Sequence, residues 1–366
     1  MNSITGALVA SLTIAAIGGW VGARAVILLA SRVGLEDVPN ARSSHTTPTP
    51  RGGGIGIVVG AMLGTLSFHL LTAGCDPAGA PIACAPRGDA AIWLGIGATG
   101  ALAMVGLADD FLNLSRRGRL ITQALAALGV LLAVDAYGTL PLALFSLLLL
   151  ASIWWINLFN FMDGIDGIAA TQALFMLGCG LLVGLLDAGR SVPGTVHGLD
   201  FIDLYGLWLL AATLGFIGLN WAPAKVFMGD VGSLFLGVSI LLTATHDVTS
   251  GHTSVWFWLI AGGMFVSDAT VTLLNRLARG EDVTTAHRSH VYQRLARRWD
   301  SHAKVTLVYF AISLSWFLPW ALLAHLFPAW GPGIAMLACL PVMAACHRLG
   351  AGEPDRPNGT HNNINR

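Results

Sequence analysis

The chain has 366 residues, of which 55% are hydrophobic and only 11% are charged, and its mean hydropathy is +0.69. Soluble globular proteins carry about 25% charged residues, so this composition excludes an ordinary soluble domain and indicates a chain that lies mostly in lipid. The formal net charge is zero, which gives no reason to expect a nucleic-acid partner.

Apolar segments long enough to cross a bilayer follow one another along nearly the whole chain. A spanning helix needs about 20 mostly apolar residues. On this criterion we mark eleven segments, some of them short, at residues 4–30, 53–73, 90–108, 119–136, 141–157, 167–186, 204–220, 232–246, 254–275, 304–326 and 332–348. A very tight connection at residues 137–141 makes ten spans the alternative. The sequence therefore predicts an all-α fold, a polytopic bundle of transmembrane helices.

The basic residues are distributed unevenly between the loops that connect these segments. If the N-terminus is external, all 20 Lys and Arg residues except Arg24, Arg87 and Arg190 fall in loops on one side. The positive-inside rule places that side in the cytoplasm. We therefore expect a multi-pass protein of the bacterial inner membrane, with a periplasmic N-terminus.

The spans leave room for only one folded unit. Residues 1–349 are predicted to form a single integral membrane catalytic domain, in which 276–303 is the longest cytoplasmic loop. The polar stretch 350–366 is predicted to be a disordered cytoplasmic tail. Cys75 and Cys84 flank part of an external loop, and whether they form a disulfide stays open.

Five polar clusters interrupt the apolar pattern, and the predicted topology places all of them on the cytoplasmic side. They lie at residues 37–54, 109–110, 157–167, 220–230 and 287–290. The topology rests only on basic residues and span lengths, so this common sidedness is independent support for a site on the cytoplasmic face.

The cluster at 157–167 contains oxygen ligands at helical spacing. Asn160, Asp163 and Gly167 share one helical face, with Asp166 beside it. Hard oxygen ligands of this kind suit Mg²⁺ or Mn²⁺ and not zinc. Gly164 and Gly167 are expected to let another backbone or a phosphate come close. The alternative interpretation is a glycine-broken helix end with solvated acids.

Asp109 and Asp110 end an apolar segment. Neighbours on a helix do not face each other. We therefore expect one of the two to point at a reaction centre and the other to be held by a cation or by backbone donors. The alternative is a plain pair of acids at the membrane surface.

The fourth cluster joins a base to an acid. Lys225 lies five residues before Asp230, and Asn220 opens the cluster as a further candidate for substrate binding. The lysine either pairs with the aspartate or binds a phosphate while the aspartate holds a metal. The glycines around Asp230 favour the second interpretation.

The last cluster gathers His287, Arg288 and His290 in the longest cytoplasmic loop. Imidazole and guanidinium groups suit a pyrophosphate and a nucleotide, although a surface helix with scattered bases is the alternative. Acids for a divalent metal and bases for phosphates, beside a bilayer, are the parts that phosphoryl transfer needs.

Taken together, these motifs resemble those of the polyprenyl-phosphate N-acetylhexosamine-1-phosphate transferases, glycosyltransferase family 4. This family includes the phospho-N-acetylmuramoyl-pentapeptide translocases and the enzymes that start O-antigen and teichoic-acid synthesis. The resemblance runs from about Asp37 to Arg294 and is carried by Asp109-Asp110, Asn160-Phe-Met-Asp163-Gly-Ile-Asp166-Gly, Phe227-Met-Gly-Asp230-Val-Gly-Ser233 and His287-Arg-Ser-His290.

The resemblance implies a reaction and a metal site. In this family the phosphate of undecaprenyl phosphate attacks the β-phosphate of a UDP-sugar and UMP is released. By resemblance, Asp230 is the principal Mg²⁺ ligand with Asn160 nearby, and Asp109 and Asp110 handle the lipid phosphate.

The resemblance also assigns the donor side. Asp163 and Asp166 match acids that line the nucleotide-sugar site, and the stretch from His287 to His290 matches the loop that meets pyrophosphate and sugar. The peptidoglycan branch has a run of histidines in this loop, whereas here an arginine and a serine separate two. The loop is therefore more similar to the O-antigen-initiating branch, several of whose members use 6-deoxy-N-acetylhexosamine donors.

The expected partners are undecaprenyl phosphate, a UDP-N-acetylhexosamine and the lipid bilayer, and a homodimer stays open. The expected role is the start of lipopolysaccharide or other cell-surface polysaccharide synthesis. A phospho-N-acetylmuramoyl-pentapeptide transferase is the alternative within the family. A transporter is the alternative outside it, but the acids cluster at one face and not at the midplane, and no inverted repeat is visible.

Overall fold

The computed structural model describes residues 2–39, 47–73, 89–112, 114–187, 199–282, 285 and 287–354. Cys75 and Cys84 lie outside these ranges, as do Arg87 and Arg190. The other three cysteines are free and buried, as small apolar residues in a helical bundle usually are.

The described residues are almost entirely helical, which confirms the predicted fold class. The helices are α1 Asn2–Val33, α2 Ile55–Thr72, α3 Ala90–Leu112, α4 Arg116–Ala133, α5 Ala136–Thr139, α6 Leu142–Phe161, α7 Ile168–Asp187, α8 Phe201–Asn220, α9 Gly229–Thr249, α10 Val255–Ala261, α11 Gly263–Ala278, α12 Val291–Trp299, α13 His302–Ile312, α14 Leu318–Leu326 and α15 Gly331–Arg348. A π-helical turn, Ser313–Phe317, joins α13 to α14, and a 3₁₀ turn, Pro328–Trp330, precedes α15. The strands β1 Glu36–Asp37 and β2 Thr49–Pro50 pair antiparallel, with Glu36 opposite Pro50.

The number of spans agrees with the lower of the two expected counts. Within the described residues, nine helices are long and apolar enough to cross a membrane, and the pair α10–α11, bent by 76°, makes a tenth. The remaining one of the eleven expected segments, 119–136, corresponds to α4. This helix carries three arginines within its 18 residues and so does not meet the same criterion. The side on which the N-terminus lies stays a prediction.

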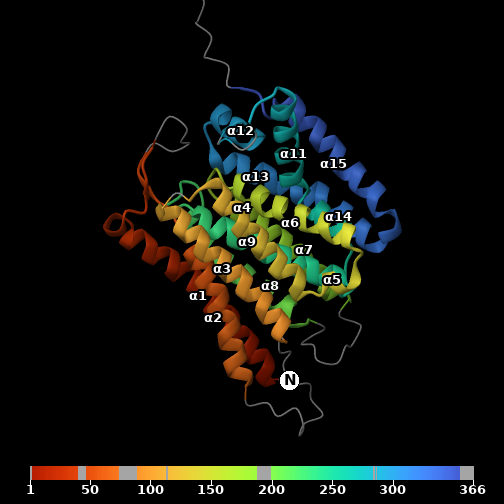
Figure 1. Ribbon diagram of the computed structural model, residues 1–366. Coiled ribbons are helices and arrows are strands. Elements are labelled where there is room, and N and C mark those ends of the chain that lie inside the picture. Colours follow the sequence, from red (N-terminus) through yellow and green to blue (C-terminus); the bar gives the residue numbers. More distant parts are fainter. Residues whose placement is uncertain are drawn as a thin grey trace, which may run out of the picture.

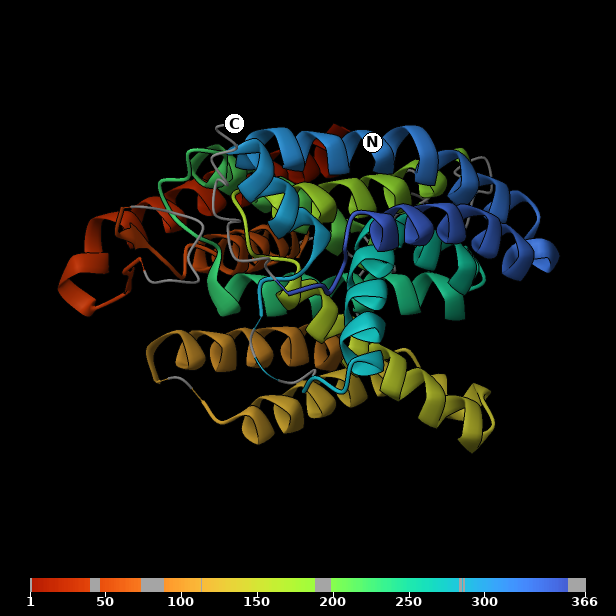
Figure 2. The ribbon, with the colours of Figure 1, turned by 90° about the horizontal axis from the view of Figure 1, so that it is seen from above.

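The central element is α9, which packs against α3, α6 and α8. It is the most deeply buried of the spans. In Figure 1 the antiparallel pair α1 and α2 lies at one side of the bundle and α15 at the other. Figure 2 shows α11 standing across the direction of its neighbours, as the 76° bend requires. The packing against three helices and its burial make α9 the centre of the bundle.

Local sequence explains where several helices begin and end. Asp200 accepts hydrogen bonds from the backbone N–H groups of Ile202 and Asp203, while the Asp203 carboxylate accepts one from the N–H of Asp200, which is a capping box at the start of α8. The hydroxyl of Ser301 accepts from the N–H of Lys304 at the start of α13. Gly280, with φ +72°, follows the end of α11.

The outer face of the bundle is apolar. Large side chains such as Leu70, Leu125, Leu147 and Leu150 are more than 60% exposed on helices that have the length of spans or lie beside them. A soluble monomer rarely exposes apolar surface on this scale. These side chains are therefore placed where a bilayer would cover them.

The chain stays bound to the bundle beyond the expected domain boundary at residue 349. Gly350 and Ala351 donate backbone hydrogen bonds to the end of α15, and the N–H of Gly352 donates to the carbonyl of Ser289 (2.8 Å). Of the expected disordered tail, residues 350–353 are thus held in place. Residues 355–366 lie outside the described part of the chain.

Candidate active site

A glycine-rich segment lies directly against the loop before α9. The N–H groups of Gly53 and Gly54 donate to the carbonyls of Phe227 and Met228 (both 2.9 Å), and the N–H of Phe227 donates to the carbonyl of Pro50 (2.8 Å). A Cβ at Gly54 would lie 2.2 Å from the Cα of Gly232. The two segments, far apart in sequence, can meet at this distance only because these positions lack side chains.

Gly229 begins α9 with φ +75°, a conformation that favours glycine. A Cβ there would also lie 2.7 Å from a carboxylate oxygen of Asp110 and 2.7 Å from the N–H nitrogen of Gly52. Both the backbone angle and the space around it therefore require glycine one residue before Asp230.

Asp110 holds the N-terminus of α9. Its carboxylate accepts hydrogen bonds from the N–H groups of Asp230 (3.1 Å) and Val231 (3.2 Å), and the Nε of Arg51 lies 3.4 Å away. A carboxylate in this place satisfies N–H groups that have no partner within the helix and interacts favourably with the helix dipole. Asp110 is therefore the member of the acidic pair that backbone donors and a cation hold, as the sequence predicted for one of the two.

Asp109 faces the Asp230 side of the site. Its carboxylate accepts from the N–H of Leu114 (2.5 Å) and from Arg119 Nη1 (3.0 Å), and it lies within hydrogen-bonding reach of the Asp230 carboxylate. Arg119 Nη1 also lies 3.7 Å from Asp230. Asp109 thus points at the candidate reaction centre. The sequence predicted that only the other acid of the pair would be held, but Asp109 is also held, by Leu114 and Arg119.

Asp230 and Asn160 meet, as expected for two ligands of one metal. The amide Nδ2 of Asn160 donates to Asp230 Oδ1 (3.1 Å) and to the hydroxyl of Ser233 (2.8 Å). The Asp230 side chain is 30% exposed, so it can be reached from outside the bundle. No hydrogen bond to the side-chain oxygen of Asn160 is found among the described residues, so this oxygen is available to a further ligand.

Asp163 lies in the loop between α6 and α7, half-buried. No described residue donates a hydrogen bond to its carboxylate. Burial raises its pKa, and the carboxylates of Asp230, Asp110 and Asp166 raise it further, to about 8. A carboxyl group that is surrounded by other carboxylates and has no donor is poised to bind a cation.

Asp166 is the acid of this loop that binds protein groups. Its carboxylate accepts from the N–H of Ala224 (3.1 Å) and lies 3.1 Å from His302 Nδ1, and its carbonyl accepts from the hydroxyl of Thr306 (2.9 Å). It borders a pocket of about 630 Å³ that Arg297 and His302 also line. The structure thus brings Asp166 to a pocket wall, close to Asp163 in sequence but with different partners.

Asn220 is the last residue of α8, whereas Lys225 lies in the loop before α9. Asn220 is 3% exposed, and its amide accepts from the N–H of Gly167 (3.1 Å) and donates to the carbonyl of Val226 (2.9 Å). It therefore shapes the loop and does not reach the surface of the site. Lys225 is exposed, and no side-chain partner for its ammonium is found among the described residues. Lys225 does not pair with Asp230, so the first interpretation of this cluster, a lysine–aspartate ion pair, is wrong.

The segment from His287 to His290 leads into α12. The two imidazole rings have centroids 4.9 Å apart, and His290 stacks on Tyr292 at 5.7 Å. Arg288 is half-buried. Burial, followed by the charges of His290 and Arg276, lowers the pKa of His287 to about 4. At neutral pH His287 is therefore a neutral hydrogen-bonding group and not a fixed cation.

Tyr292 links this segment to the acidic cluster. Its hydroxyl donates to the carbonyl of Phe161 (2.8 Å) at the end of α6. The same hydroxyl fills the space beside Gly164, where a Cβ would lie 2.1 Å from it. Gly164 therefore makes room for a tyrosine, and not for the backbone or phosphate that the sequence suggested. Gly167 is needed for its φ of +74°.

Three residues of the site were not predicted from the sequence. Arg51 and Arg119 are the cations that hold Asp110 and Asp109. Asp268, on α11, is completely buried and lies 3.4 Å from His290 Nδ1. The signal for Asp268 was present, because it is a single acid within the apolar segment 254–275 and such an acid needs partners.

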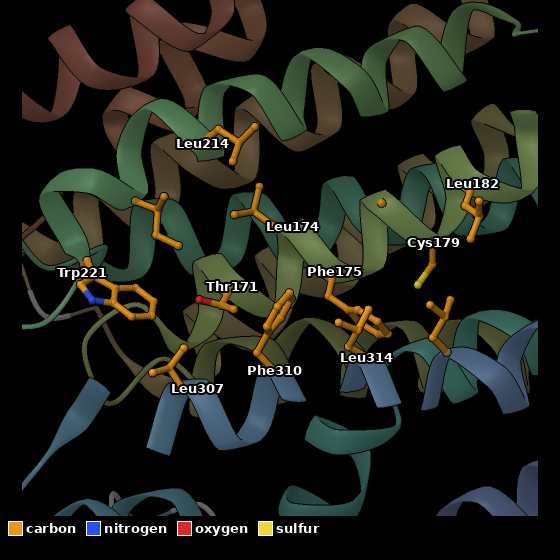
Figure 3. A pocket seen from close by; sticks show the side chains of 13 residues that line it. Thr171, Leu174, Phe175, Cys179, Leu182, Leu214, Trp221, Leu307, Phe310 and Leu314 are labelled. Carbon is orange, nitrogen blue, oxygen red and sulfur yellow. The ribbon is translucent and has the colours of Figure 1, made fainter. Parts of the chain in front are cut away.

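An apolar groove of about 490 Å³ runs from the edge of this site between α7, α8 and α13. In Figure 3 the side chains of Phe175, Leu214, Leu307 and Leu314 line it, with Trp221 at one end and Leu182 toward the other. Trp221 immediately precedes the part of the chain that lines the polar pocket beside Asp166. The end of the groove at Trp221 is therefore next in the chain to a wall of that polar pocket.

The fold and the site define a polytopic membrane protein with a carboxylate-rich site at one end of its helical bundle. Comparison with known proteins gives the family. The sequence model of the family described as "Glycosyl transferase family 4" matches residues 92–246. Decaprenyl-phosphate N-acetylglucosaminephosphotransferase of Mycobacterium tuberculosis is 30% identical over 319 residues, which cover 77% of this chain and 74% of the relative.

Two further relatives carry related names. Probable undecaprenyl-phosphate N-acetylglucosaminyl 1-phosphate transferase of Bacillus subtilis is 28% identical over 302 residues, 78% of this chain and 76% of the relative. Phospho-N-acetylmuramoyl-pentapeptide-transferase of Nocardia farcinica is 30% identical over 264 residues, 62% of this chain and 70% of the relative. This chain belongs to glycosyl transferase family 4.

Proposed function

We propose that this protein transfers an N-acetylhexosamine-1-phosphate from a UDP-sugar to undecaprenyl phosphate and releases UMP, at the inner membrane of a bacterium. A phosphate oxygen of the lipid forms a bond to the β-phosphorus of the donor. The bond from that phosphorus to the bridging oxygen breaks, and UMP leaves with the electron pair. The observation that carries the proposal is the meeting of Asp109, Asp163 and Asp230 at one end of a membrane bundle.

The carboxylates fit a divalent cation, Mg²⁺ or Mn²⁺. Asp163 receives no hydrogen bond from any described residue, and its neighbours Asp230 and Asp110 repel its charge. A hard cation prefers oxygen ligands and would relieve this repulsion. We propose Asp230 and Asn160 as its holders, with Asp163 beside them. When bound, the ion supplies charge neutralisation at the reacting phosphates.

The protein's own residues supply position and charge around the phosphates. Arg119 is 38% exposed beside Asp109 and Asp230, so its guanidinium can meet a phosphate without leaving its acids. We propose that neutral His287 and the adjacent Arg288 meet the pyrophosphate and the sugar of the donor. Lys225, exposed on the loop before α9, is available to an anionic group.

We propose that the isoprenoid chain of the acceptor lies in the groove between α7, α8 and α13. Among the described residues that line it, Thr171 alone has a hydroxyl, and this hydroxyl already donates to the carbonyl of Gly167 (2.6 Å), so the described wall is apolar. From Thr171 to Leu182 the groove follows α7 for roughly 16 Å, about half the thickness of a bilayer core. An amphipathic lipid placed there has its phosphate end near Trp221, which lies against Gly167 in the loop that carries Asp166. This placement puts Asp166 on the acceptor side, whereas the resemblance puts it on the donor side.

A glycine inside the groove allows this part of the proposal to be tested. A Cβ at Gly178 meets nothing within 4 Å, so a side chain at this position has open space from which to enter the groove, and Gly178→Leu is the test. We expect the KM for undecaprenyl phosphate to rise by about tenfold, the effect of losing contact with roughly two CH₂ groups. The KM for a ten-carbon prenyl phosphate should change little. Gly97→Leu on α3, where a Cβ also meets nothing, is the matched control and should leave both unchanged.

The donor is proposed to be a UDP-N-acetylhexosamine, including 6-deoxy forms, used for lipopolysaccharide or other surface polysaccharide. The support is the interrupted His287-Arg288-Ser289-His290 pattern, because a planar guanidinium beside the histidines can bind a pyrophosphate or an N-acetyl carbonyl at two points. Discrimination between 6-hydroxyl and 6-deoxy sugars by an apolar wall should be modest, roughly tenfold to a hundredfold.

The experiment is UMP release by the purified protein with undecaprenyl phosphate and a panel of donors at matched concentration. We expect a UDP-N-acetylhexosamine to be the best donor, and Arg288→Lys to lower its use. Because one relative is a phospho-N-acetylmuramoyl-pentapeptide-transferase of Nocardia farcinica, UDP-N-acetylmuramoyl-pentapeptide is the donor to compare. If the pentapeptide is preferred, the peptidoglycan function replaces the proposed one. If no donor is used, the proposed activity is wrong.

A further inference from the structure

Asp268 lies completely buried on α11 and binds the start of α12. Its Oδ1 accepts from the N–H of Val291 (2.9 Å) and its Oδ2 from the N–H of Tyr292 (3.1 Å). The hydroxyl of Tyr309 donates to Oδ2 (2.7 Å), and His290 Nδ1 lies 3.4 Å from Oδ1. One carboxylate thus fixes the backbone N–H groups of Val291 and Tyr292 and lies beside the imidazole of His290, directly after Arg288 and Ser289.

The same segment is held from its other side by the residues after α15. The N–H of Gly352 donates to the carbonyl of Ser289 (2.8 Å). Asn275 Nδ2 donates to the carbonyl of Ala351 (2.8 Å), and Arg279 donates to the carbonyl of Gly352. Residues 350–353, which we call the C-terminal strap, therefore join α11 to the segment before α12.

The strap has a fixed shape that a side chain would disturb. Gly352 has φ +76°, and a Cβ there would lie 2.6 Å from the carbonyl oxygen of Thr272. Ala351 is completely buried. Arg294 on α12 donates to the carbonyl of Glu353 (3.0 Å), which closes the strap against the same helix that Asp268 caps.

We propose that Asp268 and the C-terminal strap are positioning elements that clamp residues 287–292 in the geometry that meets the sugar-nucleotide donor. A segment held only by its chain neighbours would have to be ordered on binding, at an entropic cost for each residue. Two clamps that act on adjacent peptide groups remove that entropic cost before binding. Hydrogen-bond donors that are fixed in advance also stabilise developing charge best. The role in donor binding rests on the proposed function, whereas the clamping itself does not.

The inner clamp is tested with Asp268→Asn. The amide keeps one acceptor oxygen, but in either orientation its NH₂ faces a backbone N–H group, that of Val291 or that of Tyr292, so at least this hydrogen bond is lost. We expect the KM for the UDP-sugar to rise by about tenfold or more, as small misplacements of positioning groups do, with an unchanged KM for undecaprenyl phosphate. Amide hydrogen exchange of residues 287–292 should quicken. Asp247→Asn, which replaces another buried acid at the opposite end of α9, is the control.

The outer clamp is tested without touching the buried acid. A chain that ends after Leu349 lacks the strap and should show the same rise in donor KM and the same faster exchange, whereas a chain that ends after Pro354 should behave as the full chain. Gly352→Ala should mimic the loss of the strap, and Gly251→Ala, with φ +74° and open space around its Cβ, is its matched control.

The two readouts separate the inference from the proposed function. Unchanged exchange of residues 287–292 in Asp268→Asn and in the chain that ends after Leu349 would overturn the clamp. Faster exchange with an unchanged donor KM would overturn its role in donor binding. If the full-length protein turns over no UDP-sugar, the proposed function is wrong, and the exchange measurement still decides whether the clamp exists.

Discussion

Asp230→Asn is expected to lower turnover by about three orders of magnitude and to leave the protein folded. The amide is isosteric, so the contacts of α9 with Asp110 and Asn160 can be kept. The change removes the charge that we propose to hold the divalent cation, and such an ion contributes several kcal/mol of transition-state stabilisation. Each 1.36 kcal/mol is about a tenfold change in rate.

The measurement is UMP release as a function of Mg²⁺ concentration, together with the thermal unfolding midpoint. Asp89→Asn is the control, since Asp89 caps the other end of α3 through the N–H of Ile92 and an asparagine can do the same. The control should keep full activity. Retained turnover of Asp230→Asn, with an unchanged dependence on Mg²⁺, would exclude Asp230 as a metal ligand.

Asp163→Asn is expected to abolish most activity while making the metal-free protein more stable. The carboxylate has no hydrogen-bond donor among the described residues and lies close to three other acids. Its removal therefore relieves repulsion in the absence of a cation, and residues kept for function often carry such a cost in stability. We expect activity to fall by about a hundredfold or more, as it does when a positioned charged group is lost.

The pH dependence of stability follows from the raised pKa of Asp163. The native carboxyl keeps its proton up to about pH 8, whereas the unfolded carboxyl loses it near 3.8. The native state therefore binds more protons across this window, and stability falls as the pH rises through it. The loss is complete above about pH 8. Without Mg²⁺, Asp163→Asn should remove this part of the decline.

Thermal unfolding between pH 5 and pH 9, with and without Mg²⁺, checks the result. The midpoint of Asp163→Asn without Mg²⁺ should exceed that of the wild type by at least about 2 °C at pH 8 to 9, the shift that roughly 1 kcal/mol gives in a chain of this size. The difference should narrow toward pH 5 and vanish only near pH 3.8, where the unfolded carboxyl is protonated as well. A variant that is less stable than the wild type throughout would show that the Asp163 carboxylate is a structural group and not a strained functional one.

Composition and the hydropathy pattern determined the fold class and most of the helices. Burial in lipid is a property of each segment of about 20 residues, so the spans can be recognised without knowing their neighbours. The segment 119–136 was predicted to be a span because most of it is apolar. Its helix, α4, begins at Arg116 and so includes three arginines, and it does not meet the criterion for a span. The bend of 76° between α10 and α11 was likewise not predicted, since hydropathy carries no direction.

The sequence by itself also selected the acids of the site and placed them on one side. A charge is costly in such a chain, so Asp109, Asp163 and Asp230 each needed a reason to be there. Spacing along the chain could not assign their roles. Asp110 lies 120 positions from the N–H group of Asp230 that it caps, and only the packing of α3 against α9 brings the two together.

Tertiary structure alone decided which polar groups face the site and which hold it in place. Gly164 was expected to admit a phosphate, but the hydroxyl of Tyr292 fills the space beside it. Asp268 lies on another helix, and Gly352 lies beyond the expected end of the domain. Both nevertheless bind the segment 287–292. The physical reason is that side-chain chemistry is local, whereas the partner that satisfies a buried donor or charge is chosen by the packing of distant helices.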